Sequence, residues 1–125
     1  MKLVISISGN HLDSPFDPRF GRAAAFCVVD SGTGVWTAHE NPALSASGGA
    51  GVLAAQFVAK LGAHAVISGA YGPNAFDTLS PANIEMYLAP SGETLTAADV
   101  LALFKAGKLT KAGAATHAGH HGGEY

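Results

Sequence analysis

Two arginines stand three residues apart in a loop whose sequence restricts its shape. Residues 14–22 read Ser-Pro-Phe-Asp-Pro-Arg-Phe-Gly-Arg and contain both of them, Arg19 and Arg22. The two prolines fix φ and lack an N–H donor, so this segment is neither a regular helix nor an inner strand. Guanidinium groups carry permanent charge and forked donors, which suit a small anion. Asp13 and Asp17 are near enough in sequence to hold an arginine in place instead.

Two further stretches combine glycine with the expected start of a helix. Residues 41–51 run from Asn41 through Gly-Gly-Ala-Gly into a helical pattern, and residues 69–74 read Gly-Ala-Tyr-Gly-Pro-Asn. Glycine lets the backbone approach a ligand closely, and the free N–H groups at a helix start favour an anion. Taken alone, each stretch is equally well explained as turn chemistry. The Gly-Gly-Ala-Gly run at residues 48–51 matches neither a P-loop nor a dinucleotide-binding fingerprint.

The apolar patterns predict the elements that position these three stretches. Strands are expected at five places: residues 2–8, 24–30, 35–39, 65–69 and 84–88. Helices are expected at three places: residues 49–61, residues 73–79, and between a Thr96 cap and Gly107. The first helix is expected to turn its four-residue repeat to the core: Leu53, Phe57 and Leu61, with Val52 beside them. Residues 1–107 are expected to form a single domain, and residues 108–125 are expected to be a loosely ordered tail rich in Ala, Gly and His.

This order, βββαβαβα, predicts an α/β fold with a mixed five-stranded sheet and helices on its faces. The first three strands form an antiparallel meander, and the last two run parallel to the first. The loops that leave strands one, three and four then emerge at one edge of the sheet. Ligands in open α/β sheets bind outside such carboxyl ends. We therefore expect the three loops to form one site for a small anionic ligand.

Composition narrows the class of protein. The chain has 125 residues, of which 48% are hydrophobic and 13% charged, as expected for one globular domain with a real core. A formal net charge of −2 leaves no broad basic surface for nucleic acid. The apolar runs are too short for a membrane span or a signal peptide, so the cytoplasm is the default expectation.

These blocks resemble the dinitrogenase iron-molybdenum cofactor biosynthesis family. The likeness covers about residues 1–107 and keeps the order of four blocks: residues 17–23, Asn41, residues 49–51 and residues 69–75. The family includes nitrogenase cofactor carriers and the small molybdenum-copper orange proteins of anaerobic bacteria. The resemblance implies a ribonuclease H-like fold. It also implies a protein that binds or carries a metal-sulfide cluster, with an acceptor protein as possible partner, and that is not an enzyme.

One departure from the family pattern concerns the kind of cluster. Nitrogenase-cofactor binders of this family often carry a histidine before Phe-Gly, where this chain has Arg19, which cannot ligate a metal while charged. The difference argues against an iron-molybdenum cofactor and favours a thiomolybdate-type anion containing molybdenum, with copper or iron, held non-covalently. The residues expected to bind it are His11, Arg19, Phe20, Gly21, Arg22, Asn41, Gly48, Gly49, Gly51, Gly69, Tyr71, Gly72, Pro73 and Asn74.

Protein ligands to the metal are not identified by the sequence. His11 and His39 fall at the expected edge, His64 at the opposite one, and Cys27 is expected to be a buried structural thiol unless it faces the cluster. Three more candidates form a glycine-flanked group near the C-terminus: His117, His120 and His121. A solvated loop or an inert tail explains these histidines equally well.

Two other functions remain open from the residues alone. A regulatory or interaction module could bind an anionic metabolite at the same edge. A nuclease-type hydrolase fits less well, because two-metal hydrolysis needs several convergent carboxylates. The first expected strand carries none, and Asp30 falls at the far edge.

Overall fold

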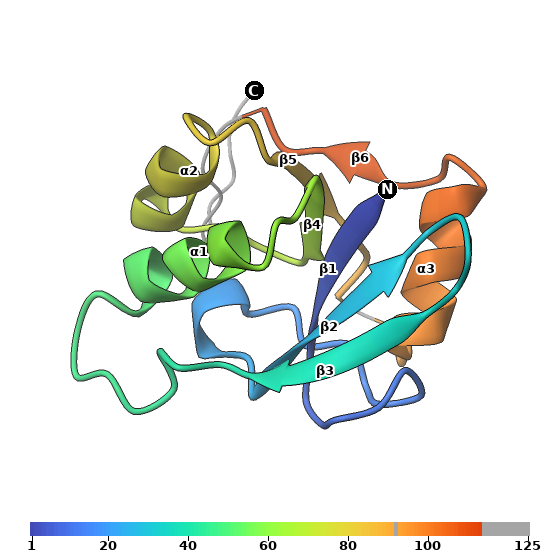
Figure 1. Ribbon diagram of the computed structural model, residues 1–125, viewed down its shortest axis with the longest axis horizontal. Helices are drawn as coiled ribbons and strands as arrows, with labels where there is room; N and C mark the ends of the chain where they lie inside the picture. The colour runs from blue at the N-terminus through green and yellow to red at the C-terminus, as the bar shows by residue number, and fades with distance from the viewer. Residues whose placement is uncertain (92, 114–125) are drawn as a thin grey trace.

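The computed structural model describes residues 1–91 and 93–113 as one sheet with helices on both faces (Figure 1). The strands are β1 (Lys2–Ile7), β2 (Ala25–Asp30), β3 (Trp36–Glu40), β4 (Ala65–Ser68), β5 (Glu85–Leu88) and β6 (Thr110–Lys111). The helices are α1 (Ala50–Lys60), α2 (Pro73–Leu79) and α3 (Ala97–Lys105), with a short 3-10 turn, η1 (Phe20–Arg22).

The strand order is β3-β2-β1-β4-β5-β6. Strands β1 to β3 form the expected antiparallel meander, and β4 and β5 run parallel to β1. The expectation of five strands is wrong, because Thr110 and Lys111 pair antiparallel with Leu88 and Tyr87 to form β6. Backbone pairing holds this strand, together with an ion pair between Lys111 Nζ and Glu85 Oε2 at 3.1 Å. Two exposed residues carry no apolar periodicity that would reveal a strand in the sequence.

Two apolar layers follow from the alternation of side chains along each strand. Helices α1 and α2 cover one face of the sheet, and α3 covers the other (Figure 1). Val4, Phe26 and Val66 point to the first layer, whereas Ile5 and Cys27 point to the second. The expectation that Cys27 is a buried thiol is confirmed.

The buried face of α1 differs from the one expected. Ala54, Ala55 and Val58 are buried, whereas Leu53 is 42% exposed. Small side chains face inward because α1 packs closely on α2, and a Cβ on Gly51 would lie 3.4 Å from Ala75 N. The four-residue repeat of large apolar residues therefore lies at the side of the helix, next to its fully buried face.

The predicted helix ends are present. Thr96 Oγ1 accepts from Asp99 N–H at 3.1 Å, and Asp99 Oδ2 accepts from Thr96 N–H at 2.9 Å, which completes a capping box. Gly62 follows α1 with φ of +79°, a left-handed conformation that glycine adopts without strain. The longest helix in the described part, α1, has 11 residues, and no helix there is long and apolar enough to cross a membrane.

Candidate functional site

The loops after β1, β3 and β4 meet at the carboxyl ends of those strands around a cavity of about 280 Å³. All three contribute to its lining, which consists of Phe20, Gly21, Arg22, Gly49, Ala50, Gly51, Gly72, Pro73, Asn74 and Ala75. The predicted convergence of the three loops is therefore present. Parallel β1 and β4, with β3 returning in the same direction through the meander, bring it about.

Two glycines allow the segments to approach one another. A Cβ on Gly21 would lie 3.3 Å from the Cα and N atoms of Gly51, so η1 rests directly on the first turn of α1. Gly51 in turn faces Ala75 N in the first turn of α2. A side chain at Gly21 would push η1 away from α1, whereas a methyl group at Gly51 would make ordinary van der Waals contact with Ala75. Because Gly21 and Gly51 have no side chains, the segments pack closely and the backbone of both residues lines the cavity.

The cavity wall contains backbone donors. Helix α1 starts after Gly49, which has φ of +70°, and α2 starts after Gly72; neither residue caps its helix through a side chain. The first N–H groups of a helix have no acceptor within it. Ala50, Gly51 and Ala75 line the cavity at these positions. The wall therefore offers N–H groups and the positive end of the α1 dipole to an acceptor.

The two arginines of the first loop have different surroundings. Arg19 Nε and Nη2 each donate to Asp17 at 3.0 Å, one to each carboxylate oxygen. Its side chain is 69% exposed, and it does not line the cavity. Arg22 is exposed, lines the cavity, and makes no ion pair with any residue of 1–91 or 93–113. Of the two predicted charges, the structure brings only that of Arg22 to the site.

Asp17 ties the first loop to the sheet. Its side chain is only 3% exposed, and its backbone N–H and C=O pair with Ser6 O at 2.9 Å and Ser6 Oγ at 2.6 Å. Burial raises the pKa of the Asp17 carboxyl. Hydrogen bonds and charge from Arg19, together with a hydrogen bond from Ser8, lower the pKa by more than burial raises it. The net pKa lies below the ordinary value, so the carboxylate stays ionised beside Arg19.

Three residues expected to bind the ligand lie beneath the loops. Tyr71 is fully buried, with its hydroxyl oxygen 3.0 Å from Val66 O and 2.8 Å from Tyr87 O. Asn41 is also buried. Gly69 packs against the loop after β1, where its N–H donates to Pro18 O at 3.1 Å. None of the three lines the cavity, and neither does Gly48. The hydrogen bonds of Asn41, Gly69 and Tyr71 indicate that these three residues support the loops.

The histidines that the structure describes lie away from the cavity. The His11 ring contacts the Trp36 ring edge-on, with centroids 4.7 Å apart, and His39 Nε2 lies 3.0 Å from Thr37 Oγ1. His64, as expected, is at the opposite edge, where its Nδ1 accepts from Lys2 N–H. Within residues 1–91 and 93–113, no group of three or more His, Cys, Asp or Glu side chains is arranged so that it could hold a metal ion. His117, His120 and His121 lie outside the described residues.

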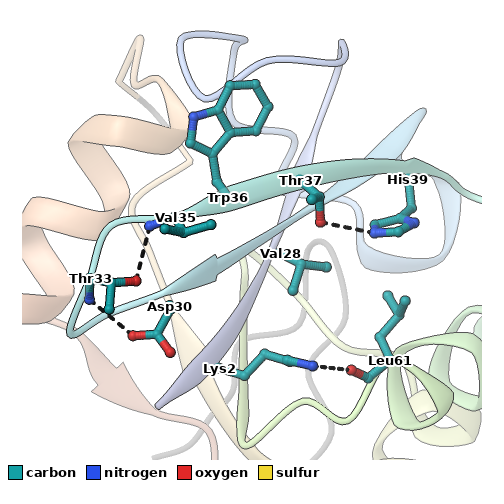
Figure 2. Close-up of a pocket in the computed structure, with 9 residues that line it drawn as sticks. All are labelled: Lys2, Val28, Asp30, Thr33, Val35, Trp36, Thr37, His39 and Leu61. Atoms are coloured by element: carbon teal, nitrogen blue, oxygen red, sulfur yellow. Dashed lines mark hydrogen bonds between the residues drawn. The ribbon is translucent and has the colours of Figure 1, made fainter.

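A second, larger cavity of about 450 Å³ lies near the opposite edge of the sheet. Figure 2 shows its lining, in which Val28 points from β2 toward the space beside Leu61 at the end of α1. The Lys2 ammonium there already donates to Leu61 O at 2.9 Å, and Asp30 adds a carboxylate. This cavity has neither the converging loops nor a helix start. The larger cavity therefore offers a lysine that is already hydrogen-bonded and a carboxylate. The smaller cavity offers the Arg22 guanidinium and N–H groups at helix starts, which suit an anion better.

A sequence model of the family described as "Dinitrogenase iron-molybdenum cofactor" matches residues 1–107. The chain belongs to this family. Every residue that lines the three-loop cavity falls within the matched part. Family membership indicates a cofactor-related binding or carrier role.

Solved structures agree with the family assignment. The apo form of the orange protein from Desulfovibrio gigas is 37% identical, with a TM-score of 0.86 over 93% of this chain and 96% of that one. A putative NifB protein from Thermotoga is 29% identical, with a TM-score of 0.75 over 88% of this chain and 91% of that one. A search of curated proteins gave no match.

Two lining residues were missed by the sequence reasoning. Ala50 and Ala75 contribute to the cavity in the first turns of α1 and α2. Their alanine side chains carry no polar atom that would single them out. The available signal was their place beside Gly49 and Gly72 at a helix start, where the backbone N–H is the functional group.

Proposed function

We propose that this protein binds and carries a small anionic metal-sulfide cluster in the cavity where the three loops meet. The observation that carries the proposal is the lining of that cavity. It combines the Arg22 guanidinium, which no carboxylate of the described chain neutralises, with backbone donors at the start of α1. Charge of one sign and N–H groups together favour an anion.

The lining also indicates how the cargo is held. Among the described residues around the cavity there is no carboxylate, imidazole or thiol that could ligate a metal. A cluster that already carries all its ligands needs none. Its sulfide or thiolate-like surface can accept N–H hydrogen bonds and rest on apolar groups such as Phe20 and Pro73. We therefore propose non-covalent binding of an assembled cluster that is passed on to an acceptor protein.

The metal content follows from the family and from one residue. The family description names an iron-molybdenum cofactor, and the orange protein is among the similar structures. The residue before Phe-Gly is Arg19, paired to Asp17. A site without an imidazole at this position supports a thiomolybdate-type anion with copper better than an iron cluster that needs a protein ligand.

A nuclease-type hydrolase has little support. The ribonuclease H-like assignment is part of our proposal and rests on the antiparallel meander followed by parallel β4 and β5. The fold does not fix the reaction. Asp17 forms an ion pair with Arg19, and Asp30 lies opposite Lys2 in the strand register, at the other end of β1. Among the described residues, the lining of the cavity between the three loops contains no carboxylate or imidazole for general acid or base chemistry, which supports a carrier.

The proposal is tested by anaerobic reconstitution. Purified protein is incubated with tetrathiomolybdate and copper, desalted, and analysed for visible absorption, molybdenum and copper. We expect a coloured protein with molybdenum in fixed ratio to the chain. High salt should release the metal, whereas a chelator of free metal ions should not. A colourless, metal-free protein would refute the proposal, and phosphate-bearing metabolites that bind in the same assay would favour the regulatory alternative.

A further inference from the structure

Asn41 connects the loop after β3 to the loop after β1. Its side chain is buried, with 3% exposed. Nδ2 donates to Ala23 O at 2.9 Å and to Gly21 O at 3.3 Å, while Oδ1 accepts from Ala43 N–H at 2.9 Å. The two carbonyl groups stand on either side of Arg22 in the chain. We propose that Asn41 is a positioning residue that aims Arg22 into the three-loop cavity, an inference that rests on the proposed function.

An amide is the side chain that this position requires. It supplies two donors and an acceptor on one rigid group, and all three face backbone atoms here. The backbone N–H of Asn41 adds a further hydrogen bond to Ala24 O at 3.1 Å. Within the turn that contains Arg22, the Arg22 N–H donates to Arg19 O at 3.2 Å. Asn41 therefore supplies much of the restraint on this turn.

Arg22 needs such restraint more than its neighbour does. The guanidinium of Arg19 is fixed by Asp17, whereas Arg22 has no ion-pair partner in the described chain. A long side chain on a loose backbone loses freedom when it binds a ligand, and a backbone fixed beforehand reduces that loss. The contribution of Asn41 to ligand binding should then pass through Arg22. This coupling separates a positioning residue from one that merely stabilises the fold.

A double-mutant cycle tests the coupling, with tetrathiomolybdate as the probe. Affinities are measured for the wild type, Arg22→Gln, Asn41→Ala and the double variant. Each single change should weaken binding by up to about fivefold, the range of an exposed charge contact. The double variant should bind no more weakly than the weaker single variant. The dependence of affinity on salt should flatten equally in Arg22→Gln and Asn41→Ala. Independent, multiplicative effects, or an unchanged salt dependence in Asn41→Ala, would overturn the proposal.

Two additions keep the test decisive. Thr96→Ala removes a hydrogen bond of the α3 cap on the other face, so it should lower stability without changing affinity or salt dependence. Asn41→Ser retains a short polar side chain and replaces Asn41→Ala if that variant does not fold.

Hydrogen exchange at the Arg22 amide needs no ligand: it should accelerate in the Asn41 variant and not in Arg22→Gln. Unchanged exchange would refute the role of Asn41, whereas a wild type that binds no tetrathiomolybdate would refute the proposed function instead.

Discussion

Arg19 and Asp17 form a two-point ion pair in which Nε and Nη2 of the arginine each lie 3.0 Å from a carboxylate oxygen. The Arg19 backbone N–H donates to the same carboxylate, also at 3.0 Å. The pair closes the first loop on itself and neutralises one of its two arginines. Arg22 consequently provides the charge at the cavity, and the two arginines should respond differently to substitution.

Arg22→Gln should weaken tetrathiomolybdate binding, because it removes the charge that lines the cavity. Arg19→Gln should leave affinity nearly unchanged and instead lower the free energy of unfolding, since it leaves the buried Asp17 carboxylate without its ion-pair partner. Arg22→Lys is the matched control that keeps a positive charge. Titrations and urea unfolding of the three variants separate the two effects. A larger loss of affinity in Arg19→Gln than in Arg22→Gln would contradict this division of roles.

Asp17 makes stability depend on pH. Its pKa is lowered in the folded protein, so the unfolded chain binds the proton more tightly. The stabilisation is fully present above the unfolded pKa of about 3.9 and is lost as pH falls through the lower folded value. Asp17→Asn should therefore cost about 1–3 kcal/mol at pH 7 and less in acid. Asp13→Asn, at an exposed position, is the control. Urea unfolding at several pH values measures both, and a cost of Asp17→Asn that is independent of pH would contradict the assignment.

Gly51→Ala should separate stability from binding. The added methyl would lie 3.4 Å from Ala75 N and cover that N–H, while alanine within a helix is favoured over glycine by about 0.5–1 kcal/mol. We expect unchanged or higher thermal stability with weaker tetrathiomolybdate binding. A Cβ on Gly48 meets nothing within 4 Å and Gly48 does not line the cavity, so Gly48→Ala should leave affinity unaltered. Equal affinities in both variants would show that the backbone donors are not used.

Cys27 should take no part in metal binding. Burial raises the pKa of its thiol to about 11, and the side chain faces the α3 layer. Thiol reagents at neutral pH should therefore react slowly with the folded protein and rapidly in urea. Cys27→Ala should retain the molybdenum content of the wild type. Fast labelling of the folded protein, or loss of molybdenum in the variant, would make Cys27 a candidate ligand.

Local signals in the sequence were reliable guides to the fold. Thr96 and Asp99 form the expected capping box because both partners lie within one turn of chain. Strand directions also followed from the order of elements, and with them the convergence of the loops. The exposed strand β6 was not predicted because backbone pairing with β5 holds it in place, and its residues have no apolar pattern. Leu53 was misplaced because the depth of a helix face depends on what packs against it, here the first turn of α2.

The site was harder to predict than the fold. Arg19 and Arg22 flank the same Phe-Gly pair, and only the closed loop decides which of them meets Asp17. Asn41 and Tyr71 were correctly placed near the edge, but their burial under the loops depends on contacts with distant parts of the chain. Spacing indicates which segments meet. It does not indicate which side chains face the cavity.

The location of bound molybdenum tests the central claim most directly. Crystals of the protein loaded with tetrathiomolybdate, measured across the molybdenum absorption edge, give the metal position without assumptions about its ligands. We predict an anomalous peak between η1 and the first turns of α1 and α2, beside the Arg22 guanidinium and without a protein atom bonded to the metal. A peak in the cavity beside Val28 and Leu61, or at a histidine with none between the three loops, would contradict the account.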